Sequence, residues 1–148
     1  MTDKFYLLVA GSRTFNDYSL LKEKLDFLLK NHTENIVIIE GEAKGADTLA
    51  KKYAEENGYE CMKFPAAWDF YGKRAGYIRN RKMHEELSKH EKRGCVLFWD
   101  MKSKGTRHNI GLCKEFKTPL RIIDYNNKKI IQTYRQELTG NEEDIERE

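Results

Sequence analysis

Short apolar runs alternate with amphipathic segments along this chain, and this alternation restricts the folds open to it. Residues 5–10 and 95–99 are continuous apolar runs, which is typical of strands buried on both faces. Between such runs lie segments with apolar residues at helical spacing, such as Leu21, Leu25 and Leu28. Strands that alternate with helices predict a parallel sheet covered on both faces, with right-handed crossovers.

We therefore expect the α/β class: a Rossmann-like three-layer sandwich with an open, mainly parallel five-stranded sheet. The expected strands lie at residues 5–10, 35–40, 59–64, 95–99 and 120–124. The Asn126-Asn127 pair can turn the chain back, which predicts an antiparallel edge hairpin at the C-terminus with a strand at 129–134. We expect one domain over residues 1–136. The acidic segment 137–148 is too charged to bury a core, and we expect it to be disordered.

Composition excludes several classes of protein. With 148 residues the chain fits one domain, and no run approaches the roughly 20 apolar residues of a membrane span. The cysteines Cys61, Cys95 and Cys113 lie in apolar segments without metal-type spacing. We expect a cytoplasmic protein with no membrane partner, no metal and no cofactor. The net charge of +3 does not single out a nucleic-acid binder, although the segment 72–93 is basic.

The loop at residues 41–47 is the first feature that indicates a ligand. Here the apolar run 35–40 turns sharply into a helix through Gly41 and Gly45. Such a turn lets the backbone approach a ligand and directs the first free N–H groups of the helix at it, which suits a phosphate. Lys44 adds a cation between the two glycines.

Similar loops follow each of the first four expected strands. Ligands of open α/β sheets bind beyond the carboxyl ends of the strands, so we expect these loops to converge. Backbone N–H groups and guanidinium groups suit a phosphate, and aromatic side chains suit a base. The candidate ligand-binding residues are Gly11, Ser12, Arg13, Gly41, Lys44, Gly45, Ala46, Asp47, Trp68, Arg79, Asn80, Lys104, Gly105 and Thr106.

Several of these residues also have purely structural interpretations. Asp47 can cap its helix or contact a ligand hydroxyl, and Arg13 can be an ion-pair partner. For Arg79 we favour phosphate binding. Trp68 can pack against the protein or stack on a base. His108 lies close to the fourth loop, but the sequence offers it no partner for nucleophilic catalysis, so no catalytic residue is assigned.

Five segments together resemble one family. They are residues 41–47, 64–69, 71–72, 75–76 and 79–80, followed by Met83. This combination is similar to the YspA-type, cpYpsA-related branch of the SLOG superfamily, which is named after the Smf/DprA and Lonely-guy proteins. The likeness extends from about residue 7 to residue 123. It implies a Rossmann-like domain that binds nucleotides or nucleotide-derived molecules, in bacteria and their phages.

The Lonely-guy branch cleaves the N-glycosidic bond of nucleoside monophosphates, with an arginine four residues before a methionine and a glutamate after a Pro-Gly-Gly-x-Gly-Thr loop. Arg79 and Met83 have that spacing here, but the glutamate position is Asn109. An amide carries no charge to stabilise an oxocarbenium-like centre and cannot activate water as a base. The loop at 101–106 has cations in place of Pro-Gly-Gly. The resemblance thus implies retained phosphate binding and lost or altered hydrolysis. If hydrolysis persists, the candidate carboxylates are Glu42, Asp47, Asp69 and Asp100.

Three functions stay open at this point. The leading one is binding or sensing of a nucleotide or nucleotide-derived small molecule through glycine-rich phosphate-binding loops, which includes sequestering a signalling nucleotide. The first alternative is a nucleotide-processing hydrolase that cleaves an N-glycosidic bond. The second alternative is DprA-like single-stranded DNA binding through the basic segment 72–93. A homo-oligomer is also expected, with Trp68, Phe70 and Tyr71 as candidate contact residues.

Overall fold

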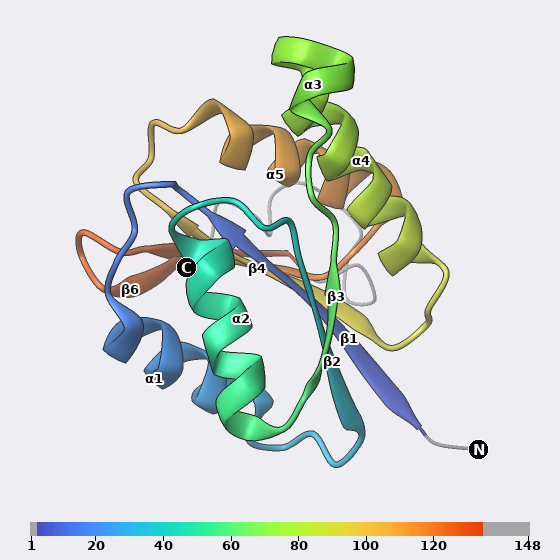
Figure 1. The fold of residues 1–148 in the computed structure, drawn as a ribbon. Helices are drawn as coiled ribbons and strands as arrows, with labels where there is room; N and C mark the ends of the chain where they lie inside the picture. The colour runs from blue at the N-terminus through green and yellow to red at the C-terminus, as the bar shows by residue number, and fades with distance from the viewer. Residues whose placement is uncertain (1–2, 135–148) are drawn as a thin grey trace.

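A computed structural model describes residues 3–134 of the chain and has the predicted α/β architecture (Figure 1). Six strands form one sheet in the order β3-β2-β1-β4-β5-β6. The first five are parallel, and β6 runs antiparallel to β5, which confirms the mainly parallel sheet and its C-terminal edge hairpin. The strands are β1 (Lys4–Gly11), β2 (Asn35–Glu40), β3 (Glu60–Lys63), β4 (Arg93–Trp99), β5 (Leu120–Asp124) and β6 (Lys129–Tyr134). The predicted domain end at residue 136 and the segment 137–148 lie outside the described residues.

The order of the strands creates one switch point in the sheet. From β1 the chain moves outward through β2 to β3, and it then returns to the other side of β1 with β4. The crossovers that leave β1 and β4 therefore run in different directions, and their loops separate at the carboxyl ends of these two strands. In open α/β sheets this is the place where ligands bind.

Helices cover both faces of the sheet. Figure 1 shows α1 and α2 together on one side of it and α4 and α5 on the other. The helices are α1 (Tyr18–Leu29), α2 (Ala46–Asn57), the single turn α3 (Trp68–Tyr71), a 3-10 turn (Gly72–Arg74), α4 (Ala75–Ser88) and α5 (Lys104–Phe116). None of the helices in the part of the chain that the structure describes has the length and apolar character needed to cross a membrane.

Alternate residues of each central strand belong to two separate cores. In β1, Leu7 and Val9 pack with α1 and α2, whereas Leu8 and Ala10 pack with α4 and α5. Both faces of the strand are thus apolar, which explains why the strand appears in the sequence as an unbroken hydrophobic run instead of an alternating one. The two cores fix the positions from which the loops at the carboxyl edge begin.

The connection from β3 to α4 contains two short helical turns. They are α3 and the 3-10 turn, and they project beyond the carboxyl edge of the sheet (Figure 1). Trp68 is 47% exposed and Phe70 is 81% exposed on this projection. Two large aromatic side chains therefore stand in solvent beside the switch point.

Candidate functional site

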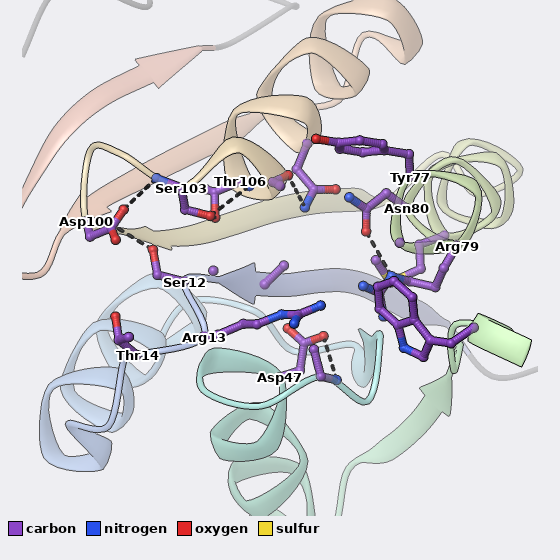
Figure 2. A pocket seen from close by; sticks show the side chains of 18 of the residues that line it. Ser12, Arg13, Thr14, Asp47, Tyr77, Arg79, Asn80, Asp100, Ser103 and Thr106 are labelled. Atoms are coloured by element: carbon purple, nitrogen blue, oxygen red, sulfur yellow. Dashed lines mark hydrogen bonds between the residues drawn. The ribbon is translucent and has the colours of Figure 1, made fainter. Parts of the chain in front are cut away.

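A cavity of about 430 Å³ opens at the switch point (Figure 2). Its walls come from the end of β1 and the following loop, the start of α2, the α3 projection, the first turns of α4, and the loop from β4 into α5. These segments are far apart in the sequence and meet only because their strands are neighbours in the sheet. The parallel topology expected from the sequence predicts this convergence.

Most of the predicted ligand-binding residues border this cavity, and some do not. Those that line it are Gly11, Ser12, Arg13, Asp47, Trp68, Arg79, Asn80, Gly105 and Thr106. Gly41, Lys44, Gly45, Ala46 and Lys104 do not line it. Both lysines are exposed to solvent. The sequence pattern located the loops correctly but could not give the direction of each side chain.

Two of the glycines are required for close packing of backbones. A Cβ atom at Gly45 would lie 2.3 Å from the carbonyl oxygen of Ser12, and the φ angle of Gly45 is 84°. A Cβ atom at Gly11 would lie 2.2 Å from the carbonyl oxygen of Phe98. Real Cβ atoms cannot approach a carbonyl oxygen so closely, and a positive φ is unfavourable for other residues. These glycines therefore bring the start of α2, the end of β1 and β4 together to form one wall of the cavity.

The loop after β2 is filled by the protein's own carboxylates. The N–H groups of Gly41 and Ala43 donate to Asp47 Oδ2 at 3.0 and 3.3 Å. The N–H group of Glu42 donates to Glu40 Oε1 at 2.6 Å. Three successive backbone donors thus already have carboxyl oxygens as acceptors, which helix entrances and tight turns favour. This loop resembles a phosphate cradle in which a side chain occupies the place of the phosphate.

Both carboxyl groups have raised pKa values. Burial raises the pKa of Asp47 to about 6, although the positive charge of Arg79, the two backbone donors and the charge of Arg13 oppose this. Burial also raises the pKa of Glu40 to about 7, against the hydrogen bond from Glu42 and with a further contribution from the nearby charge of Asp47. The charge of this loop therefore changes close to neutral pH.

Arg79 connects the filled loop to the cavity. Its Nη1 donates to the Gly41 carbonyl oxygen, and its Nε donates to Asn80 Oδ1 at 2.9 Å. Burial lowers the pKa of the guanidinium, although the neighbouring Asp47 acts in the opposite direction. The group stays protonated at neutral pH because an arginine titrates far above it. Its Nη2 has no hydrogen-bond partner among residues 3–134 and is the part of Arg79 left for a ligand.

Further cations and aromatic rings also line the cavity. The Arg13 guanidinium lies 5.5 Å from the centroid of the Trp68 ring. Lys73 and Tyr77 also line the cavity, and the Tyr77 ring lies edge-on to His108 with centroids 4.7 Å apart. Lys73 and Tyr77 were not among the predicted ligand-binding residues, although both belong to the basic segment 72–93. This wall combines positive charge with flat apolar faces.

The loop from β4 into α5 is held by Asp100. Asp100 Oδ1 accepts hydrogen bonds from the N–H groups of Lys102 (2.9 Å) and Ser103 (2.8 Å), and the Asp100 N–H donates to Ser12 Oγ at 3.1 Å. Partial burial opposes ionisation of Asp100, but these backbone donors and the Ser12 hydroxyl outweigh it and lower its pKa. The N–H of Gly105, on the cavity wall, makes no hydrogen bond within the described residues. It is an open donor in the first turn of a helix.

Asn109, at the position where the resemblance places the Lonely-guy glutamate, is held by hydrogen bonds within the protein. Its Oδ1 accepts from His84 Nε2 at 2.9 Å, and its Nδ2 approaches the Gly105 carbonyl oxygen at 3.4 Å. Burial lowers the pKa of His84 to about 4, so the imidazole is neutral and carries its proton on Nε2. Asn109 therefore links α4 to α5 at the cavity wall and supplies no catalytic charge.

The remaining lining residues were not assigned to ligand binding from the sequence. They are Ala10, Thr14, Ala43, Gly76, Met83, Asp100, Ser103 and Asn109. Of the four carboxylates considered for a hydrolase, Asp47 and Asp100 line the cavity, whereas Glu42 and Asp69 do not. Small or apolar residues such as Ala10 and Met83 have no chemical pattern that a sequence could display, and only their position in the fold identifies them.

Sequence comparisons confirm the resemblance noted from the motifs. The model of the YspA, cpYpsA-related SLOG family matches residues 5–71. The chain is also 28% identical over 127 residues to the Gene 61 protein of Mycobacterium phage D29, in an alignment that covers 82% of this chain and 97% of the phage protein. The phage protein is thus similar to this chain over nearly its whole length.

Two solved structures share the fold. DNA processing protein A (DprA) from Streptococcus pneumoniae matches 81% of this chain with a TM-score of 0.61 and 22% identity. DNA processing protein A from Helicobacter pylori, whose structure concerns a single-stranded DNA binding mode, matches 82% of this chain with a TM-score of 0.59 and 20% identity. The matches span 50% and 66% of those chains, respectively. At these identities the likeness establishes the Rossmann-like fold.

Proposed function

Because the model of the YspA, cpYpsA-related SLOG family matches residues 5–71 of this chain, we propose that the protein binds a nucleotide or nucleotide-derived small molecule in the cavity between β1 and β4. The observation that carries the proposal is the meeting of cations, aromatic faces and an open backbone donor at the switch point of the sheet. The cavity volume of about 430 Å³ is within the range of roughly 300–1,000 Å³ that small-molecule sites occupy.

The phosphate is expected at the α5 side of the cavity. The Gly105 N–H points out of the first turn of α5, where the helix dipole favours an anion. Arg13 and Lys73 line the same cavity and supply positive charge. The loop after β2 offers no such place, because Asp47 already occupies the N–H groups of Gly41 and Ala43.

The base is expected against the aromatic wall. Trp68 and Tyr77 both line the cavity and are about half exposed, at 47% and 46%. A nucleobase that stacks on either ring would cover this surface, and each base has a flat face that suits such stacking. Arg13 already lies over the Trp68 ring, so a base could also be placed beside its guanidinium plane.

Binding is favoured over N-glycosidic cleavage by the state of Asn109. Its amide is held by His84 and the Gly105 carbonyl, and it can act neither as a base nor as an anion. Cleavage would require Asp47, since Asp100 is committed to the N–H groups of its own loop. Incubation with nucleoside monophosphates should therefore release no free base.

Isothermal titration calorimetry with nucleoside mono-, di- and triphosphates, cyclic nucleotides and ADP-ribose tests the proposal. We expect saturable binding of at least one of them, weakened about tenfold by Lys73→Ala through the loss of one charge–phosphate contact. Lys104→Ala is the matched control, because Lys104 lies beside the cavity without lining it, and it should leave the affinity unchanged. Absence of binding by every anionic nucleotide would contradict the proposed function.

Single-stranded DNA binding is the second candidate, and it has an observation of its own. The α3 projection exposes Phe70 at 81% and carries Lys73 and Arg74 in the turn that follows, so aromatic and cationic groups stand together in solvent. Such surfaces bind single strands by stacking and by phosphate contacts. DprA of Helicobacter pylori, which shares this fold, is described with a single-stranded DNA binding mode.

Fluorescence anisotropy with a labelled oligothymidylate separates the two candidates. The DNA function predicts binding that weakens steeply as salt is raised, and a loss of affinity in Phe70→Ala. No binding at low salt would exclude it. A mononucleotide that binds tightly without competing with DNA would show that the cavity and the projection act separately.

A further inference from the structure

Asp47 has a carboxyl oxygen that the fold does not use. The residue is only 4% exposed, and it lines the cavity at the start of α2. Its Oδ2 accepts both N–H groups of the preceding loop. Its Oδ1 accepts no hydrogen bond in the described part of the chain. Figure 2 shows the Asp47 carboxyl group directed from the start of α2 into the cavity, beside the Arg13 side chain.

The two neighbouring arginines do not satisfy this oxygen. Arg13 lies over the Trp68 ring, and Arg79 donates to the Gly41 carbonyl and to Asn80. Their charges favour the ionised carboxylate without forming an ion pair with it in the residues that the structure describes. Asp47 thus presents a negatively charged acceptor to the cavity and is held in place by its other oxygen.

The other buried polar side chains of the cavity already have partners. Among the described residues, the side chains of this group are each hydrogen bonded within the protein: Ser12 to Asp100, Asn80 to Arg79 and His108, Thr106 to Ser103, and Asn109 to His84 and Gly105. Asp47 Oδ1 is therefore an acceptor on the cavity wall that is left for a ligand. A hydrogen bond to a charged acceptor contributes more than one between neutral groups, so a ligand that supplies a donor is favoured over one that does not.

The chemistry of this acceptor defines the part of the ligand that meets it. A carboxylate repels phosphate but accepts hydrogen bonds from neutral hydroxyl groups, which are the donors of a sugar. In a nucleotide the ribose lies between base and phosphate. We propose that Asp47 binds the ribose hydroxyl groups, so that the cavity selects ribonucleotides over their 2′-deoxy counterparts. This inference rests on the proposed nucleotide-binding function and names the class of nucleotide.

Calorimetry with matched pairs of nucleotides tests the inference. The probes are AMP, GMP, CMP and UMP, each compared with its 2′-deoxy and 3′-deoxy form. Loss of a hydrogen bond to a charged group weakens binding by about 10- to 100-fold, and we expect this preference for the ribonucleotide in the wild-type protein. Asp47→Asn keeps an oxygen for the N–H groups of the loop and places an amide at the position of Oδ1. In this variant the preference should fall to about threefold or less.

Asp69→Asn is the matched control, because it makes the same change in α3 at a position that does not line the cavity, and it should retain the full preference. Equal affinity of wild-type protein for a ribonucleotide and its 2′-deoxy form would overturn the inference and leave the proposed function intact. Absence of binding by all the probes would overturn both. Circular dichroism shows whether Asp47→Asn folds. If it does not, the affinities of the wild-type protein for ribonucleotides and their deoxy forms are sufficient to test the inference.

Discussion

The two glycine-bearing helix entrances of this chain look alike in the sequence and differ in the structure. The loop after β2 and the loop after β4 each place a lysine and a glycine at the start of a helix. In the first, the N–H groups of Gly41 and Ala43 bind Asp47. In the second, Gly105 lines the cavity and its N–H has no hydrogen-bond partner in the described residues. A glycine at a helix entrance therefore permits anion binding without deciding which anion fills the place.

The position of one aspartate explains the difference. Asp47 is in the first turn of α2, where a carboxylate is favoured by the helix dipole and can reach back to the preceding loop. The first turn of α5 has no acidic residue. Asp100 accepts hydrogen bonds from the N–H groups of Lys102 and Ser103, which lie before the helix begins. The first entrance is closed by the protein itself, and the second is open to a ligand.

The largest expected effect concerns the glycines of the two entrances. Gly45→Ala should lower the free energy of unfolding by about 3 kcal/mol or more, because the new Cβ meets the Ser12 carbonyl oxygen and φ is positive. Gly105→Ala should change it by less than about 1 kcal/mol, because the added Cβ meets open space. Chemical denaturation followed by circular dichroism measures both. Equal effects would mean that the entrances do not differ as described.

Loss of Arg79 should affect both stability and binding. Arg79→Ala leaves the Gly41 carbonyl without its donor and removes the positive charge that most favours ionised Asp47, at a cost of about 2–3 kcal/mol in the free energy of unfolding. Arg81→Ala, on the same helix, removes only an exposed ion pair with Glu115 and should leave the free energy of unfolding nearly unchanged. Denaturation and nucleotide titration of both variants check this. If Arg79→Ala still binds the nucleotide with wild-type affinity, Arg79 stabilises the loop after β2 but does not contribute to the ligand site.

The closed loop should also make stability depend on pH. Since the folded pKa of Glu40, about 7, lies above its usual value of 4.5, the stability from its protonated form is present below pH 4.5 and is lost as pH rises through 7. Glu40→Gln removes this dependence. The variant should therefore gain about 2 kcal/mol relative to wild type between pH 5 and pH 8.

Denaturation of both proteins at the two pH values measures that gain. Glu55→Gln replaces an exposed carboxylate on α2 and is the matched control, whose stability should parallel that of wild type. If the stability of Glu40→Gln also changes with pH as that of wild type does, the Glu40 carboxyl group does not cause the pH dependence.

The smallest expected effect lies on the open side of the cavity. Trp68→Ala should weaken nucleotide binding by about tenfold, as the loss of one stacked base contact does. Phe70→Ala is the control, because Phe70 is in the same turn but does not line the cavity. Equal weakening in both variants would place the ligand along the whole α3 projection and favour the DNA function. If neither variant changes the nucleotide affinity, the base does not stack on Trp68.

Much of the fold could be predicted because its signals are local. Unbroken apolar runs and helical spacing marked the strands and four of the main helices, and the Asn126-Asn127 pair marked the edge hairpin. The α3 turn was missed because Trp68 and its neighbours show no helical period and bury little. The loops of the site were also located, since parallel strands must end at the same edge of a sheet.

The chain's own residues determined which segments become strands and helices and which loops gather at the carboxyl edge, because hydrophobic spacing and turn chemistry act over a few neighbouring residues. The tertiary structure decided which donors in those loops stay open. Asp47 closes one entrance and offers its second oxygen to the cavity, and Asn109 is tied to His84 across two helices. Such pairings join residues from different elements, so they depend on the distances that packing sets between them.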